Sequence, residues 1–350
     1  MHNRRSFLKS ILATALMAHC PALVWAKSRD TSLLQSFGAL PKADRVQRIL
    51  SAGPVADVLL MSLTPEKLLG LSTRPLSKAQ QPFFSPKFRD LPLTGRLAGK
   101  GSTLSFEKII ALKPDIIVDI GSISATYVTT AERVHQQTKV PYVLMDGTLK
   151  DSPEQLSTLG DILGVSERGD QLANYATQML DRTHLLAKSS QLPEMKVYSA
   201  RGADGLETGL GGSIHTEVLD WVGAHNVAAA AGDEIIARVS MEQLMLWQPD
   251  VIITMDPEFH AKIYTLPLWQ RLNAVKNRRV YLAPTLPYGW LDRPPSINRL
   301  LGTIWLSRVL YPELMPYDEY TEWITGYFKH FYQYDLTDEA LSMLSGDLHA

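Results

Sequence analysis

The stretch LSFEKIIALKPDIIV, residues 104–118, returns in altered form as VSMEQLMLWQPDVII, residues 239–253. Four residue types fall at matching positions in the two copies: Ser105 and Ser240, Glu107 and Glu242, Pro114 and Pro249, Asp115 and Asp250. Each copy begins with apolar residues at helical spacing. A proline then disfavours helix at the residue before it, and a run of valine and isoleucine follows. Each copy therefore predicts a helix, a turn and a buried strand.

The rest of the chain continues this alternation of short apolar strands and amphipathic helices, which is typical of an α/β fold with parallel strands. Its 350 residues are enough for two domains of ordinary size. Residues 45–150 predict an N-terminal α/β lobe, residues 151–190 a helical linking segment, and residues 191–350 a C-terminal α/β lobe with a helical tail. The longest expected helix, Glu167 to Ser189, would join the lobes stiffly. The predicted fold class is α/β, with two Rossmann-like lobes joined by a long rigid α-helix.

The N-terminal residues predict an export signal rather than part of the fold. Residues 3–9, NRRSFLK, place paired arginines before an apolar run, which is the pattern of a twin-arginine signal. The alternative is a general secretory signal. Residues 1–26 would be removed by cleavage after about Ala26, which places the mature protein in the periplasm. The only cysteine is Cys20, and His19 before it fits a lipid-anchored signal poorly. The mature chain would then have no disulfide and no thiolate.

Four phrases of the sequence together resemble one known family. They are LSFEKIIALKPDIIV, SMEQLMLWQPDVII, GLGGSIHTEVLDWVGAHNVA and PYGWLDRPPSINRLLGTIWLSRVLYP. The family is that of the substrate-binding proteins of bacterial ABC importers whose two lobes are joined by one long helix, the class III periplasmic binding proteins. The resemblance extends over about residues 47–312 and implies a ligand such as a ferric siderophore, haem, cobalamin or a metal oxyanion.

The resemblance also gives the repeated glutamates a role. In this family, glutamates at the positions of Glu107 and Glu242 each dock on an arginine pocket of one permease subunit in the inner membrane. Two subunits require two equivalent acidic contacts, one on each lobe. The alternative is helix capping, because a carboxylate in the first turn of a helix is favoured by the helix dipole.

The candidate ligand-binding residues lie in loops that follow the expected strands, where open α/β sheets bind ligands. Arg96, Arg201 and Arg293 are candidates for an anion, because the guanidinium fork binds carboxylates and oxyanions through two nitrogens. The alternative for these arginines is a solvated surface position or an ion pair with Asp204 or Asp292.

Aromatic and histidine side chains in the same loops are further candidates. Tyr288 and Trp290 would stack on a large organic chelate, and Tyr127 is a weaker candidate because it lies on an expected helix, where packing is the better interpretation. His260 and then His215 are weak candidates for a metal ligand. The nine histidines form no His-x-His or His-x-x-x-His pair, so a chelated metal fits the sequence better than a bare ion.

These features predict a monomeric solute-binding protein that captures an iron(III)-siderophore or a similar metal complex between its lobes and delivers it to a permease. Molybdate, nickel or cobalt, haem and cobalamin remain alternative ligands, and a signalling receptor remains an alternative function. An exported enzyme is disfavoured, since the chain has no Gly-x-Ser-x-Gly motif and no metalloprotease histidine pair. We expect no permanent cofactor. The net charge of −1 gives no indication of nucleic-acid binding.

Overall fold

The computed structural model describes residues 33–97, 101–189, 194–232 and 235–349. From Leu33 onward the chain forms one compact unit. The expected export signal, residues 1–26 with Cys20, lies outside the described residues. None of the helices in the described part of the chain combines the length and the apolar character that a membrane span needs.

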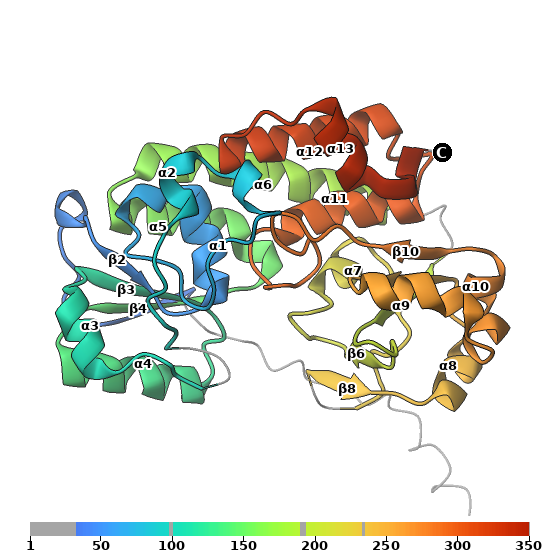
Figure 1. Ribbon diagram of the computed structural model, residues 1–350, viewed down its shortest axis with the longest axis horizontal. Helices are drawn as coiled ribbons and strands as arrows, with labels where there is room; N and C mark the ends of the chain where they lie inside the picture. The colour runs from blue at the N-terminus through green and yellow to red at the C-terminus, as the bar shows by residue number, and fades with distance from the viewer. Residues whose placement is uncertain (1–32, 98–100, 190–193, 233–234, 350) are drawn as a thin grey trace, which may run out of the picture. The chain divides into compact units, whose positions relative to one another are not determined.

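The N-terminal lobe is built on a four-stranded sheet with the order β1-β4-β3-β2 (Figure 1). Its strands are β1 (Leu34–Phe37), β2 (Ile49–Ser51), β3 (Ile116–Gly121) and β4 (Tyr142–Asp146), and its helices are α1 (Pro54–Leu63), α2 (Pro86–Arg89), α3 (Phe106–Leu112) and α4 (Ala125–Thr138). Strands β2, β3 and β4 are parallel, as the sequence predicts. Strand β1 runs antiparallel at the edge. It precedes residue 45, where we expected the lobe to begin.

The C-terminal lobe contains a parallel sheet with the order β10-β9-β5-β7 and a separate antiparallel pair, β6 and β8. The strands are β5 (Lys196–Ala200), β6 (Glu207–Gly209), β7 (His225–Asn226), β8 (Ile236–Arg238), β9 (Val251–Thr254) and β10 (Val280–Leu282). The helices are α7 (Glu217–Trp221), α8 (Met241–Trp247), α9 (Pro257–Lys262) and α10 (Asn273–Lys276). Both large sheets therefore direct the carboxyl ends of their parallel strands toward loops that can form a site.

A group of helices packs against both lobes (Figure 1). It consists of α5 (Ser152–Leu163), α6 (Ser166–Ala187), α11 (Arg299–Leu310), α12 (Tyr317–Tyr332) and α13 (Asp338–Ser345). The 22 residues of α6 span roughly 33 Å. A side chain on Gly160 of α5 would come within 2.9 Å of the Gly169 Cα of α6, so these two glycines let the helices approach closely.

One apolar core connects the two sheets through these helices. It includes Val58 of α1, Leu172 of α6, Val251 of β9 and Ile304 of α11, all of them buried. Moving one lobe relative to the other would therefore disturb packed side chains, which is costly in a protein interior. The shared core supports the stiff connection that the sequence predicts for the linking segment.

The sequence repeat is a repeat of structure. The Ser105 hydroxyl accepts a hydrogen bond from the Lys108 N–H at the start of α3, and the Ser240 hydroxyl caps α8 in the same way. Both helices end at a residue with left-handed backbone, Lys113 (φ 48°) and Gln248 (φ 45°). Such a residue ends a helix and directs the chain away from it, here into the proline and the buried strand.

The matched aspartates of the repeat connect each strand to its neighbour. The Asp115 carboxylate accepts hydrogen bonds from the backbone N–H groups of Gln47 (2.8 Å) and Arg48 (2.9 Å), just before β2. The Asp250 carboxylate accepts one from the N–H of Lys196 (3.0 Å), where β5 begins. In each of the two sheets, the aspartate of the repeat therefore bonds to the backbone at the start of the neighbouring strand.

Candidate functional site

The two lobes touch through loops at the carboxyl ends of their strands. The Gln80 side-chain amide donates to the Pro287 carbonyl oxygen at 2.6 Å. The Ser296 hydroxyl donates to the Val55 carbonyl oxygen at 2.8 Å. These bonds bring the start of α1 and the loop after it against the proline-rich loop that follows β10.

A cavity of about 190 Å³ lies at this junction. The N-terminal lobe contributes Pro54, Asp57, Leu71, Thr73, Arg74, Pro75, Leu76 and Gln80, and the C-terminal lobe contributes Tyr288, Arg293 and Pro294. Both arginine side chains are exposed. Within the described residues neither guanidinium forms an ion pair or a side-chain hydrogen bond. Two arginines without an ion-pair partner in the described part of the chain, one from each lobe, therefore line one small cavity together with a single carboxylate, that of Asp57. The excess of positive charge is an arrangement that attracts an anion.

A buried carboxylate fixes the loop that carries Arg74. The Asp57 side chain accepts hydrogen bonds from the Ser72 backbone N–H (3.0 Å) and the Ser72 hydroxyl (2.6 Å). Burial raises the pKa of Asp57, while the hydrogen bonds from Ser51 and Ser72 oppose that rise. Because Ser72 precedes Arg74 by two residues, Asp57 sets the path of the chain toward the cavity.

Arg201 lies on the C-terminal lobe just after β5, where we expected a ligand-binding arginine. Its guanidinium is paired with the buried carboxylate of Asp292, as the alternative interpretation of this residue held. Burial and the positive charge of Arg293 lower the pKa of Arg201 to about 10, so it remains charged at neutral pH. The charge of Arg201 is therefore largely satisfied within the protein, unlike that of Arg293.

His215 completes this cluster. Its Nδ1 lies 2.9 Å from the same carboxylate oxygen of Asp292. Burial, together with the nearby positive charges of Arg201 and Arg299, lowers the pKa of His215 to about 4. The imidazole is therefore neutral at pH 7, and Nδ1 carries the hydrogen that it donates to Asp292.

The aromatic candidates divide between the cavity and the core. Tyr288 lines the cavity and packs edge-on against Phe84, with ring centroids 6.0 Å apart. Trp290 is fully buried, and its indole N–H donates to the Leu286 carbonyl oxygen at 2.9 Å. Placing Trp290 on a ligand-binding surface was wrong, because the proline-rich loop folds its side chain into the shared core. Tyr127 packs against the core of the N-terminal lobe, as its helical position suggested.

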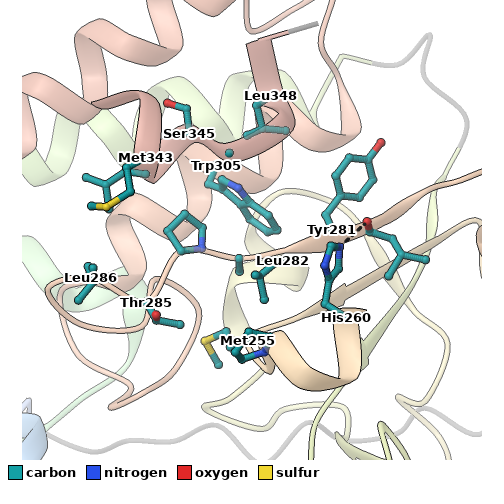
Figure 2. Close-up of a pocket in the computed structure, with 16 residues that line it drawn as sticks. Met255, His260, Tyr281, Leu282, Thr285, Leu286, Trp305, Met343, Ser345 and Leu348 are labelled. Atoms are coloured by element: carbon teal, nitrogen blue, oxygen red, sulfur yellow. Dashed lines mark hydrogen bonds between the residues drawn. The ribbon is translucent and has the colours of Figure 1, made fainter. Parts of the chain in front are cut away.

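His260 lies in a different part of the C-terminal lobe (Figure 2). It lines a groove of about 290 Å³ between α9, the β10 segment and the end of α13, together with Trp305 and Met343. Its Nε2 lies 3.3 Å from the Val280 carbonyl oxygen. The groove includes no residue of the N-terminal lobe, so His260, which we expected in the ligand cleft, lies apart from the interlobe cavity. Strand β9 ends before α9, and this short helix directs His260 away from the junction.

Arg96 forms hydrogen bonds to residues 101 and 103 of the loop in which it lies. Its Nε donates to the Gly101 carbonyl oxygen at 2.8 Å, and its N–H donates to the Thr103 hydroxyl at 3.0 Å. The backbone next to it reaches the end of β2, where the Leu97 N–H donates to the Ala52 carbonyl oxygen. These bonds explain its position without a ligand.

No cluster of three or more histidine, cysteine or acidic side chains that could hold a bare metal ion occurs within residues 33–97, 101–189, 194–232 and 235–349. The lining of the interlobe cavity is cationic rather than metal-binding. Its two arginines suit an anion or an anionic chelate better than a bare cation.

Among the charged residues of the cavity, the sequence predicted Arg293 but not Arg74 or Asp57. We searched only loops that directly follow strands, whereas Arg74 lies in a long irregular segment after α1. The available signal was an arginine before a proline in a segment with few apolar residues, and that signal is weak. The signal for Asp57 was an acidic residue in an otherwise apolar helix.

Several known proteins are similar to this chain in sequence and in fold. The family described as periplasmic binding protein matches residues 70–286. A molybdate-binding protein, MolA, from Haemophilus influenzae is 25% identical over 278 residues, which are 71% of this chain and 74% of MolA. A vitamin B12-binding protein from Vibrio vulnificus is 25% identical over 75% of this chain and 90% of its own length. The solved structure of an ABC transporter solute binding protein from Sulfurospirillum deleyianum has a TM-score of 0.78 and 29% identity, and the match covers 87% of this chain and 95% of that one.

Proposed function

The chain belongs to the periplasmic binding protein family, in the class III group that serves ABC importers, and we propose that it carries a small anionic metal species to an inner-membrane permease. Members of this family are substrate-binding transport proteins rather than enzymes. The observation that carries the proposal is the pair Arg74 and Arg293, which line one cavity from opposite lobes without a partner among the described residues.

The size of the cavity favours a tetrahedral oxyanion such as molybdate. Its volume of about 190 Å³ lies below the roughly 300–1,000 Å³ of pockets that enclose drug-sized ligands. Haem, cobalamin and most ferric siderophores exceed that size. A bare cation of nickel or cobalt would be repelled by the two arginines. The name of the Haemophilus influenzae relative supports the same ligand class.

An anionic ferric siderophore, the ligand that we expected from the sequence, is the second candidate. Tyr288 supports it, because its ring lines the cavity beside Arg293 and could pack against an organic chelate. Such a ligand would have to extend from the cavity into solvent. In either case the metal arrives with the ligand, and the protein holds no cofactor of its own.

Delivery would use the two repeated glutamates. Glu107 and Glu242 are exposed at the first turns of α3 and α8. The pKa of each is lowered by its own backbone N–H and by the capping serine, so both remain ionised. We propose that the monomeric protein docks through them in the periplasm on arginines of the two permease subunits, where complementary charge sets orientation and association rate.

Isothermal titration calorimetry tests the ligand class. The wild-type protein is titrated with molybdate, tungstate, sulfate and an anionic ferric siderophore, alongside the variants Arg74→Gln and Arg293→Gln. Each variant should bind the preferred anion about 10-fold more weakly, equivalent to about 1.4 kcal/mol, because one charge-assisted hydrogen bond is lost. Lys78→Gln is the matched control, since Lys78 is an exposed cation of the same segment outside the cavity lining. Unchanged affinity in both arginine variants would show that the ligand binds elsewhere.

A further inference from the structure

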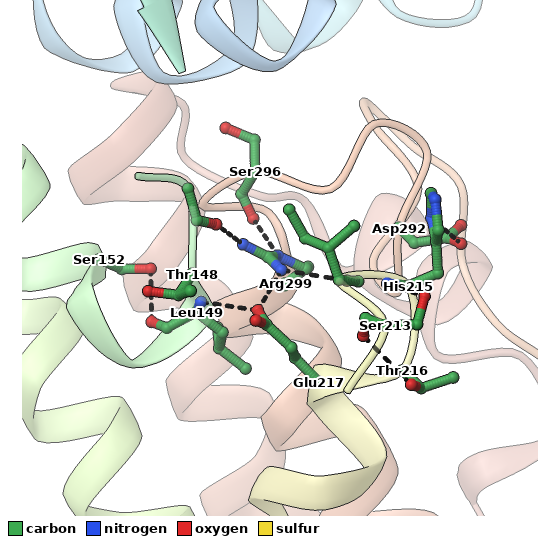
Figure 3. Close-up of polar contacts among 12 residues, drawn as sticks. Thr148, Leu149, Ser152, Ser213, His215, Thr216, Glu217, Asp292, Ser296 and Arg299 are labelled. Carbon is green, nitrogen blue, oxygen red and sulfur yellow. Dashed lines mark hydrogen bonds and ion pairs between the residues drawn. The ribbon is translucent and has the colours of Figure 1, made fainter. Parts of the chain in front are cut away.

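Arg299 is a buried cation at the start of α11, with 1% of its side chain exposed. Its guanidinium donates to four oxygen atoms (Figure 3). Within the C-terminal lobe it reaches the carbonyl oxygens of Ser296 (3.1 Å) and Ile214 (3.2 Å) and the carboxylate of Glu217 (2.5 Å). The fourth bond goes to the Gly147 carbonyl oxygen of the N-terminal lobe, directly after β4.

Glu217, the ion-pair partner of Arg299, also bonds to the N-terminal lobe. The carboxylate oxygen that accepts from Arg299 also accepts from the Leu149 backbone N–H at 2.8 Å. Each member of the pair is therefore bonded to its partner and to the short segment 147–149 of the N-terminal lobe (Figure 3). The two lobes are joined here through two backbone groups and one ion pair, in which Arg299 is buried and Glu217 is partly buried.

The geometry of this junction permits little movement. A guanidinium presents its donors in a rigid planar fork, and here every nitrogen has an acceptor in place. Separating the lobes by even 1 Å would stretch the bonds to Gly147 and Leu149. It would leave a buried charge with unsatisfied hydrogen-bonding capacity, which is strongly unfavourable. The other cross-lobe bonds, from Gln80 and Ser296, are single hydrogen bonds between neutral groups and resist movement less.

We propose that the Arg299–Glu217 pair is a spacer that fixes the separation of the lobes, and that it thereby sets the largest ligand the interlobe cavity admits. The pair itself lies outside the cavity lining. It acts on the ligand through the position of the proline-rich loop, because Arg299 closely follows Arg293 and bonds to Ser296 between them. The spacer part of the inference stands on the structure alone, whereas the part about ligand size rests on the proposed function.

Spin labels on the two lobes test the spacer. Cys20 is replaced by serine, and labels are attached to Glu132→Cys on α4 and Glu258→Cys on α9, both exposed positions. Pulsed electron spin resonance then gives the distribution of distances between lobes. Arg299→Lys keeps the charge but loses the fork, and Glu217→Gln keeps the shape but loses the charge. Both should broaden the distribution and shift it to longer distances.

Arg182→Lys is the matched control. Arg182 also pairs with a glutamate, Glu319, and also donates to a backbone carbonyl, that of Leu314. This pair connects α6 to α12, and its bonds reach neither the segment 147–149 nor the proline-rich loop. The control variant should lose stability without changing the distance between labels. An unchanged distance distribution in folded Glu217→Gln would overturn the spacer, and this variant carries the test if Arg299→Lys does not fold.

Competition binding tests the consequence for ligand size. With molybdate as the small anion and an anionic ferric siderophore as the large one, the affinity ratio should shift at least fivefold toward the large anion in Glu217→Gln. Lobes that separate without any change in this ratio would overturn the role in size selection. If the wild-type protein binds neither anion, the proposed function fails, while the distance measurement still decides whether the pair is a spacer.

Discussion

Asp57 offers a direct test of how the cavity is built. Replacing it with alanine removes the acceptor for the Ser72 N–H and the Ser72 hydroxyl. Ser72 is 1% exposed, so water cannot easily replace the lost carboxylate. Each buried donor left without a partner costs about 1–3 kcal/mol. We expect Asp57→Ala to lower the free energy of unfolding by about 2–4 kcal/mol, and to weaken anion binding because the segment that carries Arg74 loses its anchor.

The isosteric variant separates charge from hydrogen bonding. Asp57→Asn keeps an amide oxygen for the Ser72 donors, so it should cost no more than about 1.5 kcal/mol. The raised pKa of Asp57 also lowers the expected cost of Asp57→Asn. A carboxyl group whose pKa is higher in the folded protein destabilises the fold above that pKa, and the penalty diminishes as the pH falls through it. A neutral asparagine avoids this penalty at pH 7.

Urea unfolding followed by tryptophan fluorescence measures the stability of both variants, and calorimetry measures their affinity for the anion. A double-mutant cycle with Arg74→Gln isolates the positioning effect. If Asp57 acts through Arg74, Asp57→Ala should weaken binding in the wild-type background and much less in the Arg74→Gln background, whereas Asp57→Asn should weaken it little in either. Equal losses in the two backgrounds, or an Asp57→Ala protein as stable as the wild type, would refute this reasoning.

Two further predictions concern docking and pH. Glu107→Gln and Glu242→Gln should each reduce uptake in reconstituted vesicles without changing ligand affinity, and the double variant should lose more; normal transport by the double variant would leave both residues as helix caps only. Because the pKa of His215 falls from 6.5 to about 4 on folding, His215 contributes stability above pH 6.5 that is lost as the pH falls toward 4. We expect the loss to be about 1–2 kcal/mol, allowing for partial exposure, and smaller in His215→Gln; equal pH profiles from urea unfolding of the two proteins would contradict this.

The sequence predicted those helices and strands that are determined by local signals within their own residues. The serine cap, the proline stop and the apolar run of each repeat are local signals, and the helices and strands they predict are present. Strand β1 was missed because its pairing with β4 depends on a distant partner and only four residues take part. The pair β6 and β8 was missed for the same reason, since three residues on each side give no period to detect.

The candidate site was less predictable because pairing in three dimensions decides what each side chain can do. The loop positions of Arg201 and Arg293 look alike in sequence, yet only Arg201 meets the buried Asp292. Trp290 lies two residues after Tyr288, but the loop directs one ring into the core and the other toward the cavity. Loop composition indicated cationic and aromatic side chains in this region, but it did not distinguish those that line the cavity from those that are paired or buried.

The two copies of the repeat contain residues that build the fold and one residue, the glutamate, that does not. The serines cap helices, the prolines end them, and the aspartates bond to the neighbouring strand. Glu107 and Glu242 differ, because within the described residues neither forms an ion pair and each is fully exposed, with hydrogen bonds only to its own first turn. A cap alone does not require them, since the serines already satisfy the N–H groups of Lys108 and Gln243. Two lobes with different loops and different cavity residues thus present the same unpaired carboxylate at the same structural position, as a partner with two similar subunits would require.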